Sequence, residues 1–231
     1  TGGVAGTSQS TIFGTLTNPT NLVQTATYTV TPTSGTTGSC VGSSFTVTVT
    51  VNPKPVIPVQ ASTICSGSAF TVSPINATPT TATIVPSGTT YTWTVVDNPD
   101  VSGDVDQSTA QTSISQNLIN LTNTVQTVVY TVTPASGSAG NCVGASFTLT
   151  VTVNPTPIIA NVIPSSICSG NLFTVNPING GGTSSNDIVP TGTTYTWSAP
   201  TVTGGVTGGV AGTSQSTIFG TLTNPTNLVQ T

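Results

Sequence analysis

Residues 45–51 read FTVTVTV, and this stretch decides the fold class of the chain. Apolar and threonine side chains alternate in it, so Phe45 and the three valines lie on one face of an extended strand. Residues 147–153, FTLTVTV, repeat the pattern from Phe147 onward. β-Branched residues in strict alternation are typical of strands with one buried and one hydrated face. The sequence therefore predicts a strand at both places.

Aromatic residues mark further strands. YTVT begins at Tyr28 and Tyr130, and YTW begins at Tyr91 and Tyr195. No stretch carries the 3.6-residue apolar period of a helix, and Gly, Pro and β-branched residues are frequent. We expect these aromatic side chains in the cores of the domains: Tyr28, Phe45, Tyr91, Trp93, Tyr130, Phe147, Tyr195 and Trp197.

The chain is repetitive. Residues 207–231 are identical to residues 1–25, at an offset of 206. A weaker match halves that distance, because VNPKPV at 51–56 returns as VNPTPI at 153–158. A period of this kind indicates an array, and a unit of about 100 residues is the size of an ordinary domain. Adjacent units differ while alternate units match, so the chain is a window on an array whose building block is a pair of domains.

Proline pairs separate the units. Pro53 and Pro55 form one pair, and Pro155 and Pro157 form the other. Proline fixes φ and holds the preceding residue extended, so these joints are short and stiff. The sequence predicts the C-terminal half of one Ig-like repeat in residues 1–52, a complete repeat in 53–154, and the N-terminal three quarters of a copy of the first type in 155–231.

Together, these signals predict an all-β chain of tandem Ig-like antiparallel β-sandwich domains of about 100 residues, arranged as a rod. A tryptophan on the third strand is an expected core residue of such a sandwich, and Trp93 fills that place. In the complete repeat we expect strands near residues 56–62, 69–75, 89–96, 112–121, 126–133 and 145–153.

The composition argues against most chemistry. The chain has one basic residue, Lys54, five acidic residues, no histidine and a net charge of −4. Catalytic Ser-His-Asp and Cys-His arrangements cannot be built, and no Glu pair exists, so we expect no enzyme. Nucleic acid is not an expected partner because no basic patch could neutralise phosphates. No signal peptide and no segment for membrane insertion is visible within these residues.

Two kinds of cysteine occur in each unit. Cys65 and Cys168 precede the second strand, whereas Cys40 and Cys142 lie between the last two strands. The absence of CxxC pairs and histidine favours disulfides over a metal site. In an Ig-like sandwich the two kinds lie at opposite ends, about 26 Å apart, while a disulfide spans at most about 7 Å between Cα atoms. We expect bonds between successive units, with Cys65 joined to a cysteine beyond residue 231; the alternative is a Cys65–Cys142 bond.

An acidic loop follows the third strand of the complete unit. Its carboxylates could supply oxygen ligands to calcium, whereas the plainer interpretation is a solvated loop. The third unit does not repeat these acidic residues. At the equivalent positions it has Thr201, Gly204, Gly208 and Val210. Apart from this candidate calcium site, no cofactor is expected. Asn76 and Asn120 match the glycosylation sequon. The candidate calcium ligands are Asp97, Asp100, Asp104 and Asp106.

The recurring strings ICSG, FTV, GTTYTW, YTVTP, CVG and FTVTVTVNP resemble the Ig-like and PKD-like tandem repeats of giant cell-surface adhesins of Bacteroidota. Adhesins of that group are exported by the type 9 secretion system and include gliding-motility adhesins. The resemblance covers the whole sequence. It implies an extracellular, cell-surface filament or stalk, in which neighbouring repeats of the same chain are each other's partners.

The leading hypothesis for the function is structural: a stiff stalk or spacer in an adhesin or surface filament. One alternative is a set of repeated modules that bind glycans or extracellular surfaces. The other is a subunit of a self-assembling extracellular fibre, because edge strands without charge lack the usual protection against pairing. All tyrosines and tryptophans lie on expected strands rather than loops, which favours the structural hypothesis.

Overall fold

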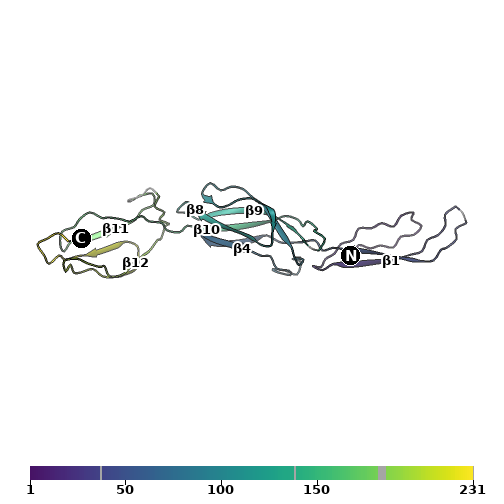
Figure 1. Cartoon of the computed structure of the whole chain (residues 1–231), viewed down its shortest axis with the longest axis horizontal. Coiled ribbons are helices and arrows are strands. Elements are labelled where there is room, and N and C mark those ends of the chain that lie inside the picture. Colours follow the sequence, from purple (N-terminus) through teal and green to yellow (C-terminus); the bar gives the residue numbers. More distant parts are fainter. Residues whose placement is uncertain (37, 138, 182–185, 231) are drawn as a thin grey trace.

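The computed structural model describes the chain from Thr1 to Gln230, except residues 37, 138 and 182–185. All regular structure among these residues is β, and no helix occurs. Accordingly, the described part contains no helix that could cross a membrane. The strands fall into three groups, which follow one another along the longest axis in Figure 1.

The first group is the hairpin of β1 (Gln24–Val30) and β2 (Phe45–Val51). The third group holds β11 (Leu172–Val175), β12 (Tyr195–Trp197), β13 (Gly212–Gln215) and β14 (Ile218–Thr221). The middle group contains β3 (Gln60–Cys65), β4 (Ser68–Val72), β5 (Thr90–Val95), β6 (Val101–Ser102), β7 (Gln107–Gln111), β8 (Ile114–Asn120), β9 (Gln126–Ala135) and β10 (Phe147–Asn154).

The middle group forms a two-sheet sandwich of the Ig-like kind. One sheet has the strand order β3-β10-β9-β5-β7 and the other has the order β4-β8-β6. Neighbours are antiparallel except β3 and β10, which run parallel with Cys65 opposite Asn154. The predicted all-β, Ig-like sandwich is confirmed, and its pairing is antiparallel apart from this edge pair of the larger sheet. The first and last strands run in the same direction because the chain enters at one end of the sandwich and leaves at the other.

The core of this sandwich follows the alternation seen in the sequence. Along β10 the apolar side chains of Phe147, Leu149, Val151 and Val153 are buried, while the intervening threonines are not. Every hydrophobic residue buried in the described chain lies between Ile57 and Val153. Tyr91, Trp93 and Tyr130 belong to this core, as expected for the complete repeat.

The outer groups leave the equivalent residues uncovered. Phe45 is 47% exposed, whereas its counterpart Phe147 is 6% exposed. Tyr28, Tyr195 and Trp197 are half-buried rather than buried. In the described residues these four side chains lack the cover that their counterparts in the middle sandwich have, so their place in a core stays a prediction. Residues 1–52 contain no counterparts of β4 and β5, and residues 155–231 contain none of β9 and β10.

Two details of the strands differ from the expectation. The first strand of the complete unit spans Gln60–Cys65 rather than residues 56–62, and Val56 instead forms an isolated bridge with Ile84. The short strands β6 and β7 were not expected. Their sequences, VS and QSTAQ, carry no apolar alternation that could have revealed them.

Candidate functional site

The joint before the middle sandwich is tightly covered. Pro53 and Pro55 are fully buried, while Lys54 between them is exposed. The loop between β9 and β10 lies against this joint: a Cβ added at Gly144 would come within 2.5 Å of the Pro55 carbonyl oxygen. A Cβ added at Gly140, in the same loop, would overlap the side chain of Asn52. Glycine is therefore required where the loop closes over the joint.

A pair of backbone hydrogen bonds follows each joint. The Val56 N–H donates to the Ile84 carbonyl at 2.9 Å, and the Ile84 N–H donates back at 2.8 Å. Ile158 and Ile188 make the same pair at 2.9 and 2.7 Å. Each joint is thus anchored to the unit that follows it.

An asparagine ties the other end of the middle sandwich together. The Asn120 side-chain NH₂ donates to the carbonyls of Val153 at 2.9 Å and Thr124 at 2.7 Å. Its Oδ1 accepts from the backbone N–H of Thr122 at 2.8 Å. Asn120 is 1% exposed, so the turn after β8 is fixed to the last residues of β10, where the chain leaves the unit. Both NH₂ hydrogens are used and the group is buried, which makes the sequon at Asn120 inaccessible in the folded chain.

The same clamp recurs at equivalent positions. Asn18 donates to the carbonyls of Val51 at 2.9 Å and Leu22 at 2.7 Å. Asn224 donates to the Leu228 carbonyl at 2.7 Å but reaches no counterpart of Val51. This clamp was not predicted from the sequence. Its signal was the recurrence of asparagine at the same place in all three units.

The acidic loop uses two of its carboxylates to hold the backbone. Asp104 is 6% exposed and accepts from the Asn98 N–H at 2.9 Å, while Asp106 accepts from the Val95 N–H at 2.8 Å. Asp97 and Asp100 are exposed. Within the described residues, no group of three His, Cys, Asp or Glu side chains is arranged to hold a metal ion. The four acids named from the sequence are thus not brought together as one ligand set.

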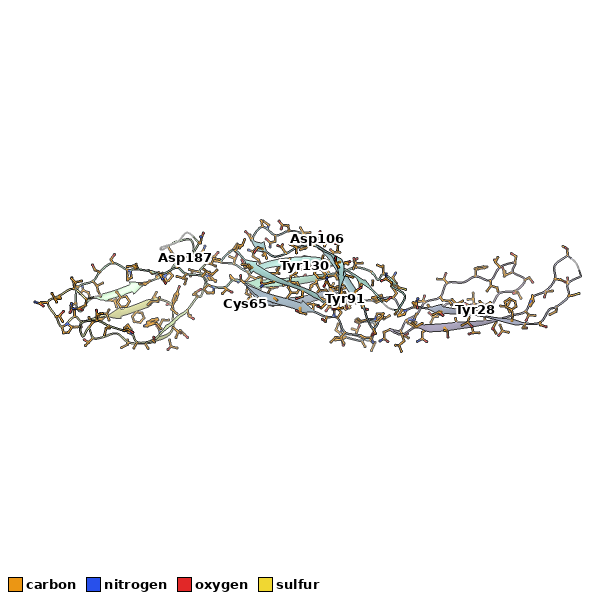
Figure 2. The ribbon with its side chains drawn as sticks, viewed as in Figure 1. Tyr28, Cys65, Tyr91, Asp106, Tyr130 and Asp187 are labelled. Atoms are coloured by element: carbon orange, nitrogen blue, oxygen red, sulfur yellow. The ribbon has the colours of Figure 1, made fainter. Side chains whose placement is uncertain are left out.

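The fifth acid, Asp187, has an unusual position. It is 3% exposed and lies near the second joint (Figure 2), where its Oδ1 accepts from the Ala160 N–H at 2.9 Å. Its Oδ2 is buried without a hydrogen-bond partner in the described part of the chain. A buried, unpaired carboxylate oxygen is costly. No role was predicted for Asp187, because its neighbours GGTSSN carry no recognisable motif.

Two core tyrosines are held in the neutral form. Burial raises the pKa of Tyr91 to about 12. Burial, together with the negative charge of Asp104, raises the pKa of Tyr130 above its usual value. The Tyr130 hydroxyl donates to the Gln116 side-chain oxygen at 2.8 Å. This interior suits packing rather than acid–base chemistry near neutral pH.

All four cysteines are free thiols in this structure. Cys65 ends β3 opposite Asn154, at the end of the middle sandwich nearest to residues 155–231 (Figure 2). Cys142 precedes β10, near the opposite end. The strand between these ends spans about 24 Å, far beyond the limit of about 7 Å for a disulfide. The alternative Cys65–Cys142 bond is therefore out of reach within one unit.

These features define a complete Ig-like β-sandwich with a short proline segment before it and another after it. The PKD-like domain family matches residues 1–55 and again residues 62–157, so the chain belongs to that family. No curated protein matches the chain. An Ig-like sandwich of this family is a non-catalytic fold, and extracellular modules commonly carry it.

Proposed function

We propose that this chain is a stiff, extracellular stalk or spacer in a cell-surface adhesin or filament. The observation that carries the proposal is the path through the complete unit, which enters at the Pro53–Pro55 joint and leaves beside Asn154 at the opposite end. Units linked in this way add length along one direction. Buried joint prolines and the Asn120 clamp restrict bending at both ends.

Imaging of single molecules by electron microscopy tests the stalk directly. We expect isolated particles one sandwich wide, with a narrow distribution of bend angles at the joints. Replacement of Pro53 and Pro55 by glycine should broaden that distribution, because glycine releases φ. Replacement of the exposed Val59 by glycine is the matched control, and it should leave the distribution unchanged. Equal bending in the wild type and the double proline variant would overturn the proposal.

The particular setting rests on the resemblance of the repeat strings to Bacteroidota adhesins. We propose export by the type 9 secretion system and display on the cell surface, with a role in adhesion or gliding. Surface labelling of cells with and without a working type 9 system tests this setting. Equal surface labelling in both strains would contradict it.

We further propose that disulfides lock successive units together. Cys65 lies at the end where the chain leaves the middle unit, and Cys142 lies near the end where it enters. In a head-to-tail array we therefore expect a thiol of the Cys65 kind to lie near a thiol of the Cys40 and Cys142 kind in the following unit. Two thiols would form one S–S bond and lose two protons and two electrons to a disulfide oxidant, which becomes a dithiol. Non-reducing peptide mapping should find Cys40-type joined to Cys65-type peptides. Cys65–Cys142 peptides from one unit would refute the pairing.

A second candidate function is a self-assembling fibre. It is favoured by the scarcity of charge, because residues 1–53 contain no charged side chain to protect strand edges. Lateral bundles in the same images would support this candidate over the stalk. Glycan binding has less support, since Tyr91, Trp93 and Tyr130 are committed to the core.

A further inference from the structure

The first and last strands of the middle sandwich are paired with each other in parallel. β3 is an edge strand of its sheet and has β10 as its strand neighbour, whereas β10 lies between β3 and β9. The register runs from Gln60 opposite Leu149 to Cys65 opposite Asn154. This pairing, the β3–β10 ladder, joins the strand that follows the first proline joint to the strand that precedes the second.

Tension along the chain acts on these two strands in opposite directions. It reaches β3 from the joint at Pro53 and Pro55, and it leaves β10 through the joint at Pro155 and Pro157. Because both strands run from the entering end of the unit to the leaving end, the pull slides β3 along β10 and does not peel it away. All hydrogen bonds of the ladder are then loaded together. Two strands that are pulled apart from the same end lose their bonds one after another, at a lower force.

The attachment of β3 to the unit depends on this ladder. None of the side chains of β3 is fully buried, and Ile64 is the one that packs against the core. By contrast, β10 is paired on both sides and its apolar side chains are buried. The two backbone bonds between Val56 and Ile84 lie closer to the first joint, but they form only an isolated bridge. The ladder is therefore the longest paired stretch that the pull has to break.

Further hydrogen bonds hold the end of β10. The Ser66 N–H donates to the Asn154 carbonyl at 2.8 Å, which extends the ladder by one bond. Beyond it, the Thr156 hydroxyl donates to the Ser66 carbonyl at 3.2 Å. The Asn120 side chain donates to the Val153 carbonyl at 2.9 Å and so ties β10 to β8 in the other sheet. Since the end of β10 is held from both sheets, β3 is the strand that has to slide.

We propose that the β3–β10 ladder is the tension-bearing element of the unit, which keeps the sandwich folded when the chain is pulled from both ends. It yields only when the backbone bonds between Gln60–Cys65 and Leu149–Asn154 break together. The proposal rests on the stalk function for the source of the tension. The ladder itself belongs to one sandwich, so its strength is measured separately from the bending of the joints. Flexible joints would overturn the stalk alone, and a weak ladder would overturn this proposal alone.

Single-molecule force spectroscopy in two pulling geometries tests the proposal. Ala145→Cys, directly before β10, is introduced into a chain whose four native cysteines are replaced by serine. Pulled through its two chain ends, this variant should open the middle sandwich in one step that releases roughly 300 Å, because a residue extends by at most about 3.6 Å. Pulled through the N-terminal end and residue 145, both at the entering end, it should open at a several-fold lower force. Equal forces in the two geometries would overturn the proposal.

A matched pair of proline variants locates the resistance in the ladder. Successive N–H groups of a strand point to opposite sides, and the Ser66 N–H points to Asn154. The N–H of Ser62 therefore faces β10, whereas that of Thr63 faces the open edge of the sheet. Ser62→Pro removes a ladder bond and should lower the end-to-end unfolding force, while Thr63→Pro should keep the wild-type force. Equal forces in two variants that circular dichroism shows to be folded would refute the ladder as the resisting element.

Discussion

At the scale of single residues, Asn120 has a stabilising role that the alternation pattern of the sequence does not reveal. Its amide bridges a local turn and the end of β10, 33 residues away. A buried amide that satisfies carbonyls from two segments cannot be replaced by water when it is removed. The residue therefore links local turn geometry to the packing of the whole sandwich.

Asn120→Ala should destabilise the middle sandwich by about 3 kcal/mol, because it leaves buried carbonyl and N–H groups without partners. Denaturant unfolding followed by Trp93 fluorescence, in a Trp197→Phe background, measures the free energy of unfolding. Asn117→Ala on the exposed face of β8 is the matched control, with an expected change below about 0.5 kcal/mol. Equal effects of the two substitutions would contradict the role given to the clamp.

The core tyrosines predict a loss of stability in alkali. Burial raises the pKa of Tyr91 to about 12, and burial together with the charge of Asp104 raises the pKa of Tyr130. Just above about pH 10, both side chains therefore stay neutral in the folded chain, whereas they ionise in the unfolded chain. The contribution of these tyrosines to the free energy of unfolding is constant below about pH 10 and is lost as the pH rises above that value. Melting temperatures measured between pH 9 and 12 should fall, and Tyr91→Phe should make the fall shallower. A fall as steep in Tyr91→Phe as in the wild type would contradict this cause.

At the scale of elements, the repeated 25-residue segment shows how far local sequence determines structure. Residues 212–221 form β13 and β14, which pair with β12 and β11. The identical residues 6–15 form no strand. The difference comes from the partners, because residues 155–206 supply β11 and β12 to pair with, whereas residues 6–15 pair with no strand in the described chain. Strand formation here is therefore a property of pairing and burial, not of propensity alone.

The same contrast explains what could be predicted from the sequence. Alternation in FTLTVTV assigned both faces of β10, because the pleat has a period of two regardless of the partner. It could not show that Phe45 is exposed, since exposure depends on which strands are present to cover it. Nor could it identify Asn120 or Asp187, whose partners lie 33 and 27 residues away. Long-range hydrogen bonds leave no periodic trace.

The acidic loop between β5 and β7 should not require calcium. Asp104 and Asp106 already accept backbone hydrogen bonds within the loop, which satisfies the carboxylates that a cation would otherwise share. The melting temperature should be equal in calcium and in a chelator. Asp104→Asn should lower it in both conditions, whereas the exposed Asp97→Asn should not. A calcium-dependent rise that Asp104→Asn removes would restore the calcium site.

At the scale of the whole molecule, the middle sandwich holds the closed core of the described residues, and the domain prediction makes residues 1–52 the C-terminal half and residues 155–231 the N-terminal three quarters of the other unit type. Among the residues that the structure describes, the buried hydrophobic side chains all lie between Ile57 and Val153. The offset of 206 residues makes Thr231 equivalent to Thr25, so residues 26–52 continue directly from the end of the third segment. Cooperative stability of the second unit type should therefore appear when the two halves are joined.

A chain lengthened by appending residues 26–52 after Thr231 should acquire a second closed sandwich. Calorimetry should then show an added cooperative transition with an enthalpy of about 70 kcal/mol, the value expected for a unit of about 100 residues. Appending the same residues with Tyr28→Asp and Val49→Asp should not give the added transition, because both substitutions place a charge on the face that the core needs. A missing transition in the lengthened wild-type chain would show that the two segments are not parts of one unit.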